Sequence, residues 1–245
     1  MSGHSKWATI KHKKAATDAK RGSLFTKLIK EISVAARGGG NPGTNPRLRV
    51  AIERAKESSM PSDNIDRAIK KGTGQLEGVT YEDITLEGYG PGGVAIYIEG
   101  VSDNRNRTTA EVRTIFTKKG GNMAGAGSVA WMFEKKGYIV VSKATVGEDK
   151  LMSVALDAGA EDMIVEDENY AIKTSVQDFF KVKKAVDDAS IKTEDAEITL
   201  LPKNTVKVEG PDAKKILDLV DAIEEHEDVQ HVYANFDIPD DLISE

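Results

Sequence analysis

The stretch GSLFTKLIKEISVAARGGG, residues 22–40, decides the first element of the fold. Its apolar residues recur with the spacing of a single face of an α-helix. We expect Ser23 to be the N-cap of this helix, and the glycines at 38–40 to end it. The apolar stripe consists of Leu24, Phe25, Leu28, Ile29, Ile32, Ala35 and Ala36.

Two shorter helices are predicted downstream of this stretch. Asn45-Pro46 has the residue types of an N-cap followed by a first helical residue, and Pro61 opens another helix that ends at Gly72. Three amphipathic helices joined by short loops predict a small helical domain, residues 1–78. The inward positions are Leu48, Ala51, Ile52 and Ala55 in one helix and Ile65, Ala68 and Ile69 in the other.

Upstream, residues 1–22 are polar and basic. Residues 8–20 favour a helix that Gly22 would break. Trp7 is the large aromatic residue of this arm, and it either packs on the body of the protein or stacks on a base or ribose.

Charge is distributed unevenly along the chain. Residues 1–75 hold sixteen Lys and Arg against six Asp and Glu, a net charge of +10. The whole chain is −6, so the remainder is −16. A basic segment joined to an acidic body indicates a module that binds a polyanion, although a charge run can also be only a solvated surface.

Residues 79–132 are expected to contribute two strands and a helix. Strands are predicted at 81–86 and 94–99, around a glycine-rich turn. Thr108 and Glu111 have capping-box spacing, which would start a helix there. Arg105 and Arg107 lie just before this start, where they could form a second anion site or pair with Asp103 and Glu111.

The segment Gly120 to Gly127 is rich in glycine but matches neither a P-loop nor a dinucleotide-binding signature. We interpret it as a turned loop.

Residues 133–203 predict the element order βαββαβ, a ferredoxin-like domain. The last helix, 211–225, and the last strand, 229–236, cannot bury their own faces, so we expect them to complete residues 79–132. The predicted fold is therefore α+β and multidomain: a three-helix domain and two ferredoxin-like-type α/β sandwich domains, one inserted in the other. The expected domains are residues 1–78, residues 79–132 plus 204–240, and the inserted residues 133–203.

The composition excludes several classes of site and protein. The chain has no Cys, which excludes disulfides and cysteine-ligated zinc. It has no apolar run long enough for a membrane helix or a secretory signal, so we expect a cytoplasmic protein with no membrane partner. His4, His12, His226 and His231 lack the spacing of a zinc site, and no nucleophile motif is present. We expect no catalysis, no cofactor and no metal.

Several motifs together resemble those of the YebC/PmpR family, over residues 2 to about 239. They are Gly3-His4-Ser5-Lys6-Trp7, Asp18-Ala19-Lys20-Arg21-Gly22, Asn45-Pro46-Arg47-Leu48-Arg49, residues 87–93, residues 102–108 and Gly120-Gly121-Asn122. The resemblance implies three domains, one of them interrupted, in a cytoplasmic DNA-binding transcriptional regulator. The family is also similar to mitochondrial translational activators, and its members have been linked to ribosomes and to translation through proline-rich sequences.

Two functions remain open at this point. One is a DNA-binding transcriptional regulator, and the alternative is a translation factor that binds ribosomal RNA and supports synthesis of difficult sequences. The acidic α/β domains would then be free to meet a protein partner. The residues expected to contact nucleic acid are Lys6, Trp7, Lys11, His12, Lys13, Lys14, Lys20, Arg21, Lys27, Arg47, Arg49 and Arg54.

Overall fold

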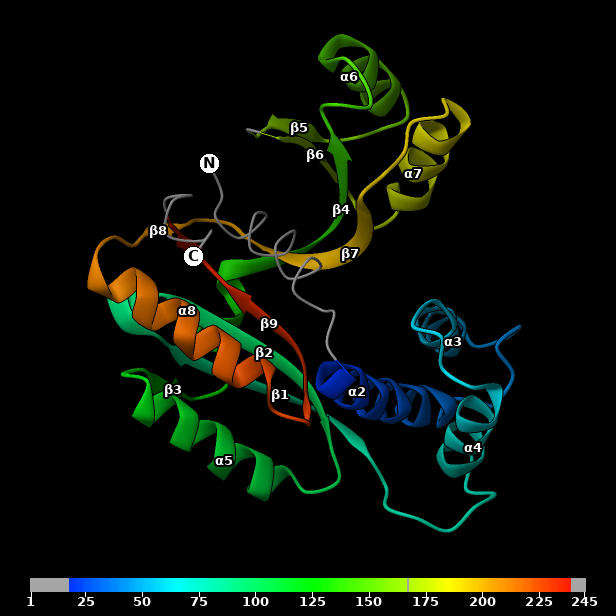
Figure 1. Ribbon diagram of the computed structural model, residues 1–245, viewed down its shortest axis with the longest axis vertical. Helices are drawn as coiled ribbons and strands as arrows, with labels where there is room; N and C mark the ends of the chain where they lie inside the picture. The colour runs from blue at the N-terminus through cyan, green and yellow to red at the C-terminus, as the bar shows by residue number, and fades with distance from the viewer. Residues whose placement is uncertain (1–17, 167, 239–245) are drawn as a thin grey trace.

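The computed structural model describes residues 18–166 and 168–238, with side chains from residue 22 onward. Figure 1 shows a helical domain at one end of a four-stranded sheet, with a second sheet and its two helices rising from the other side. The predicted fold class is confirmed.

The helical domain contains α2 (Asp18–Ala36), α3 (Pro46–Glu57) and α4 (Ser62–Gly72). Its core contains the other predicted apolar residues, with Ile32, Leu48 and Ala55 fully buried, whereas Leu24, also predicted to face inward, is exposed. The expected start of the first helix is wrong, because α2 is already helical at Asp18, so Gly22 and Ser23 lie inside it. Glycine in a helix interior costs only about 1 kcal/mol relative to alanine, and good helix formers on both sides of Gly22 continue the helix across it.

Asn45 is the N-cap of α3, as predicted. Its side-chain oxygen accepts a hydrogen bond from Leu48 N at 3.1 Å. Its amide nitrogen donates to the carbonyls of Ala35 and Gly39, at 2.7 and 2.8 Å, and so ties the end of α2 to the start of α3.

We expect Asn45→Ala to lower the free energy of unfolding by about 2 kcal/mol, at the upper end for the loss of a cap, because the two carbonyls of α2 also lose their donor. Urea denaturation measures the change. Thr44→Ala, at an exposed neighbouring position, is the control and should change stability by less than about 0.5 kcal/mol. Equal effects of the two substitutions would contradict this role for Asn45.

The central sheet has the strand order β3-β1-β2-β9. One face is covered by two helices, whose side chains Phe116, Ile216 and Ile223 are buried against Ile96 and Ile98 of the sheet. The sheet joins segments far apart in the chain, because β2 pairs antiparallel with β9. The elements are β1 (Glu82–Tyr89), η1 (Pro91–Gly93), β2 (Ala95–Ser102), α5 (Arg105–Lys118), β3 (Asn122–Ala124), η2 (Ala130–Met132), α8 (Pro211–Glu224), β9 (Val229–Ala234) and the short parallel pair β8 (Val206–Lys207) and β10 (Phe236–Asp237).

Helix α5 starts four residues earlier than the capping-box spacing predicted. Asn104 is its N-cap, and its side-chain oxygen accepts a hydrogen bond from Arg107 N at 3.1 Å. Asn is as good a cap as Thr. Thr108 is instead buried inside the first turn, where its hydroxyl donates to the Asp228 carboxylate at 2.5 Å.

The second sheet, between β3 and β8 in the chain, has the order β5-β6-β4-β7 and is antiparallel throughout. This is the predicted βαββαβ arrangement. Its core includes the fully buried Ile139, Leu151 and Ile172. The elements are β4 (Phe133–Ser142), α6 (Glu148–Asp157), β5 (Asp162–Val165), β6 (Asn169–Thr174), α7 (Phe179–Asp188) and β7 (Asp195–Pro202). The residue boundaries of the three domains stay a prediction.

Candidate nucleic-acid interface

Half of the residues predicted to contact nucleic acid belong to the N-terminal arm, outside the residues whose placement is described. These are Lys6, Trp7, Lys11, His12, Lys13 and Lys14. The backbone of Lys20 and Arg21 is helical, but their side chains also lie outside the described part.

The first predicted cation with a described side chain, Lys27, is used inside the protein. Its ammonium group donates to the carbonyl oxygen of Glu224, at the end of α8, at 2.6 Å. One helical turn further along α2, Lys30 is 5 % exposed and donates to the Asp228 carboxylate at 2.6 Å. Both lysines therefore hold α2 against the central domain instead of facing solvent.

Asp228 is the centre of this contact between domains. Its fully buried carboxylate accepts hydrogen bonds from Lys30 of α2, from Arg107 at 2.8 Å and from Thr108 of α5. Burial alone would raise its pKa, but these three donors outweigh that effect and lower the pKa of Asp228 to about 2. The same contact raises the pKa of Arg107 above its ordinary value. The carboxylate stays ionised and joins the helical domain to the central sheet.

At the second anion site predicted from the sequence, Arg105 and Arg107, the guanidinium group of Arg107 already binds carboxylates of the protein. Arg107 donates to Asp103 and to Asp228, both at 2.8 Å, and its Nε lies 3.9 Å from Glu111. This matches the alternative in which the arginine pairs with its own carboxylates. Arg105 is exposed on the same turn.

Arg47 and Arg54 of α3 also have acidic partners. Arg47 forms a bidentate pair with Asp83, at 2.8 and 2.6 Å, and these hydrogen bonds raise its pKa. Arg54 lies 3.6 Å from Glu31. Both arginines line a cleft of about 620 Å³ between the three domains, which also contains the carboxylates of Glu99 and Glu197. The lining also includes Glu31, Asp83 and the cation Lys135, so the four carboxylates of the cleft face three cations.

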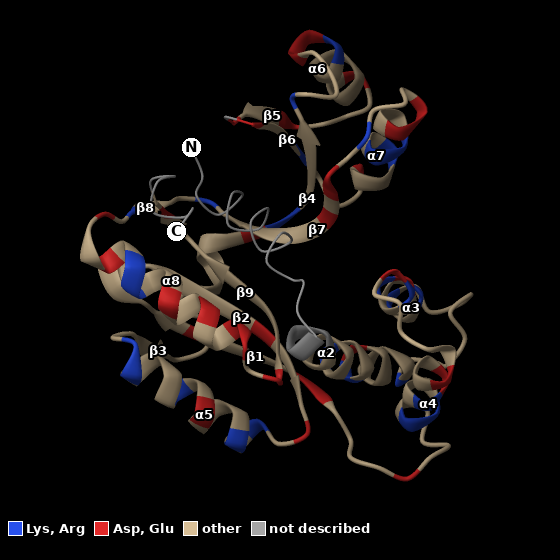
Figure 2. Cartoon of the chain, in the orientation of Figure 1, with Lys and Arg blue, Asp and Glu red and all other residues tan. Residues whose placement is uncertain are grey.

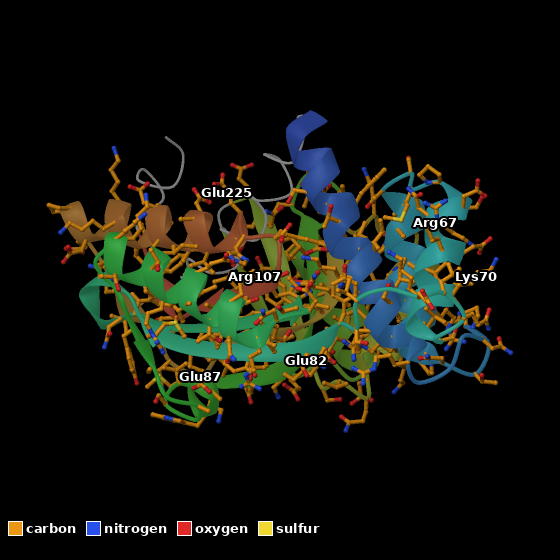
Figure 3. All side chains as sticks on the ribbon, turned by 90° about the horizontal axis from the view of Figure 1, so that it is seen from below. Arg67, Lys70, Glu82, Glu87, Arg107 and Glu225 are labelled. Atoms are coloured by element: carbon orange, nitrogen blue, oxygen red, sulfur yellow. The ribbon has the colours of Figure 1, made fainter. Side chains whose placement is uncertain are left out.

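A different set of cations faces solvent on the helical domain: Arg49, Lys56, Arg67 and Lys70. None of the four makes an ion pair within the described residues 22–166 and 168–238. Figure 2 shows basic residues on α3 and α4, and Figure 3 shows Arg67 and Lys70 on α4 at the end of the molecule opposite α8. Only Arg49 was among the residues predicted to contact nucleic acid.

Lys56, Arg67 and Lys70 could have been found from the sequence. Ile65, Ala68 and Ile69 fix the buried face of α4, and Arg67 and Lys70 fall on the other side. A count of charges gives the sign of the segment but does not say which residues lie on the exposed face of each helix, and for this reason Lys56, Arg67 and Lys70 were not among the predicted contacts.

The glycine-rich segment is a turned loop only in part, because Asn122–Ala124 form the strand β3, which pairs with β1. The turn that follows β3 already holds an anion with its backbone. The buried carboxylate of Glu87 accepts hydrogen bonds from the N–H groups of Gly127, Val129 and Ala130, at 2.7, 2.6 and 3.0 Å. Burial would raise the pKa of Glu87, and these bonds lower it overall. Gly127 has a φ of 83°, which the turn requires. Nothing in the sequence pointed to Glu87 as the partner of this loop.

Other kinds of site receive no support from the described residues. Among them, no group of three His, Asp or Glu side chains is placed to hold a metal ion. None of the helices at 18–166 and 168–238 has the length and apolar character needed to span a bilayer.

Comparison with known proteins covers nearly the whole chain. Residues 5–75 match a family model described as the TACO1/YebC protein N-terminal domain, and residues 81–236 match one described as the TACO1/YebC second and third domain. A probable transcriptional regulatory protein of Dictyoglomus turgidum is 58% identical over 99% of this chain and 98% of its own. A second probable transcriptional regulatory protein, of Geobacter sulfurreducens, is 58% identical over 97% of this chain and 96% of its own length. The crystal structure of a conserved hypothetical protein from Aquifex aeolicus has a TM-score of 0.80 and 49% identity, over 93% of this chain and 94% of that one.

Proposed function

Because the chain belongs to the TACO1/YebC family, whose relatives are named probable transcriptional regulatory proteins, we propose that it is a DNA-binding regulator of transcription and not an enzyme. The contact is made by the basic arm together with the outer surface of the helical domain. The names of the relatives support the general role, and the charges of the helical domain support the location.

One observation carries this proposal: four exposed cations of α3 and α4, Arg49, Lys56, Arg67 and Lys70, have no carboxylate partner in the described part of the chain. A Lys or Arg already paired with a carboxylate must give up that partner to meet a phosphate, whereas an unpaired one only releases counterions. Arg49, Lys56, Arg67 and Lys70 therefore form the interface with Lys6, Lys11, Lys13, Lys14, Lys20 and Arg21. Lys27, Arg47 and Arg54 are left out of it.

The negative charge of the remaining chain determines how the protein is oriented when it is bound to nucleic acid. With residues 76–245 at a net charge of −16, the two α/β domains are repelled by the same polyanion that attracts the helical domain. Most of their surface faces away from a duplex held by the helical domain, where a protein partner can reach it.

We expect the quadruple reversal of Lys13, Lys14, Lys20 and Arg21 to Glu to abolish binding to duplex DNA while leaving the circular dichroism spectrum unchanged. With about six phosphate contacts, the affinity of the unaltered protein should fall about 10³-fold between 50 and 200 mM salt. Fluorescence anisotropy with a labelled duplex measures both effects. Affinity that responds to neither salt nor reversal would overturn the proposal.

The same titration with ribosomal RNA fragments separates the alternative function. Phosphates of structured RNA would meet the same cations, so the salt dependence alone does not distinguish the two targets. Competition between duplex DNA and ribosomal RNA at a fixed salt concentration does distinguish them. Preference for duplex DNA supports the regulator of transcription, and preference for ribosomal RNA, with cosedimentation on ribosomes, supports the translation factor instead.

A further inference from the structure

Trp131 is unusually exposed for a large aromatic side chain. It lies in η2, just before β4, and 62% of its surface is accessible. Tryptophan usually buries most of its large apolar surface in a core or an interface.

The ring is held in this exposed position by hydrogen bonds. The indole N–H donates to the carbonyl oxygen of Ser128 at 3.0 Å, and the hydroxyl of Tyr89 donates to the same oxygen at 3.2 Å. The N–H groups on the chain just before Trp131 are bound by the Glu87 carboxylate. Val129, two residues before Trp131, is fully buried. The turn that carries the ring is therefore rigid, and the ring is preorganised.

A cation lies beside this turn. Lys203 is an exposed residue just after β7. Its ammonium group donates a hydrogen bond to the carbonyl oxygen of Trp131 at 2.9 Å, and its backbone N–H donates to the carbonyl oxygen of Met132 at 2.9 Å. These bonds tie together the two places where the chain passes between the central and the inserted domain. They also place a positive charge at the backbone of the residue that carries the exposed indole.

The chemistry of the turn favours a flat, anionic ligand. The indole N–H already has its acceptor, so the ring face is what remains for a ligand. The residues leading into the turn, Gly125, Ala126 and Gly127, are small, and the surface is not a broad apolar patch of the kind that protein partners cover. Stacked bases need an open ring face and a nearby cation for the backbone.

We propose that Trp131, with Lys203 beside it, is a stacking platform for an unpaired base of single-stranded nucleic acid. This inference rests on the proposed nucleic-acid binding and adds a second contact to it, away from the helical domain. The turn clamped by Glu87 positions the ring.

Tryptophan fluorescence tests the platform directly. In a Trp7→Phe background Trp131 is the only tryptophan of the chain. Its emission should be quenched on titration with a single-stranded oligonucleotide of about 20 nucleotides, longer than the site of about 4–16 that one binding fold covers. A fully paired duplex of the same length should quench it far less, because its bases are already stacked.

Affinity measurements on substituted proteins complete the test. Trp131→Ala should weaken single-strand binding about 5- to 150-fold, the range for loss of one stacked base, without changing the slope of log affinity against log salt. Trp131→Phe should restore most of the affinity. Phe180→Ala removes another exposed aromatic residue, 66% accessible on α7, and should have no effect.

The failures can be told apart. If Trp131→Ala leaves single-strand affinity unchanged and the ring is not quenched, the platform is rejected while salt-dependent binding by the helical domain can still stand. Quenching by a protein ligand but not by the oligonucleotide would also reject it and identify a protein contact. If neither duplex nor single strand binds, the proposed function fails together with it.

Discussion

Asp228→Asn is expected to lower the free energy of unfolding by about 3–5 kcal/mol, because it leaves the buried ammonium group of Lys30 without its counter-charge. Asparagine keeps only one of the two oxygens, so its NH2 group must face either Lys30 or the pair Arg107 and Thr108, all of which are donors. The helical domain should also detach from the central sheet more easily, since Lys30 belongs to α2 and the other two residues to α5. Urea denaturation gives the free energy, and limited proteolysis reports the detachment.

Glu227→Gln is the matched control. Glu227 is the adjacent acid and lies 3.9 Å from the same ammonium group, but its side chain is 64% exposed. Exposed pairs of this kind contribute about 0–1 kcal/mol. Similar losses for the two substitutions would show that Asp228 has no special role in holding the domains together.

The same carboxylate makes stability depend on pH. Its pKa is about 2 in the folded protein, below its ordinary value of 3.8, so its stabilising effect is complete above about pH 4. The effect is lost as the pH falls from there to about 2. Between pH 5 and 2 the unaltered protein should therefore lose more stability than Asp228→Asn, and parallel curves for the two would contradict the low pKa.

The double substitution Arg67→Glu and Lys70→Glu is expected to weaken duplex binding about 100-fold at low salt. Each residue is proposed to meet one phosphate, and a charged hydrogen bond contributes about 1.5–3 kcal/mol, so two lost contacts at the lower end of this range, together about 3 kcal/mol, correspond to a change of this size. The slope of log affinity against log salt should become less steep by about 2. Fluorescence anisotropy across a salt series measures both quantities.

Lys118→Glu with Lys119→Glu makes the same change of charge at exposed positions at the end of α5. This control should bind DNA almost as well as the unaltered protein. If both double variants lose affinity equally, net charge alone governs binding and α4 is not part of a defined surface. Circular dichroism confirms that each variant remains folded.

Much of the fold could be predicted because its signals are local. The stripes of α2, α3 and α4 and the cap at Asn45 each depend on neighbouring residues. Even the insertion followed from counting elements that could not bury their own faces. The start of α2 was misplaced because the helix continues across Gly22, and the start of α5 because Asn104 caps a helix as well as Thr108 does.

The candidate interface was harder to predict because ion pairs depend on contacts between distant residues. Lys27 and Lys30 each meet a group about 197 residues further along the chain, which no local pattern reveals. Arg47 likewise finds Asp83 only after folding. Charge counting gave the sign of the segment, and the structure was needed to separate the cations that hold domains together from those that face solvent.

The pairing of β2 with β9 has a consequence for how the protein is made. Synthesis runs from the N-terminus, so residues 133–203 have all been synthesised before the strand that completes the sheet around them exists. The inserted domain can finish folding while its host still has an open edge. The anchor for Lys30, Asp228, is synthesised almost last, so the helical domain must wait for the end of translation before it docks.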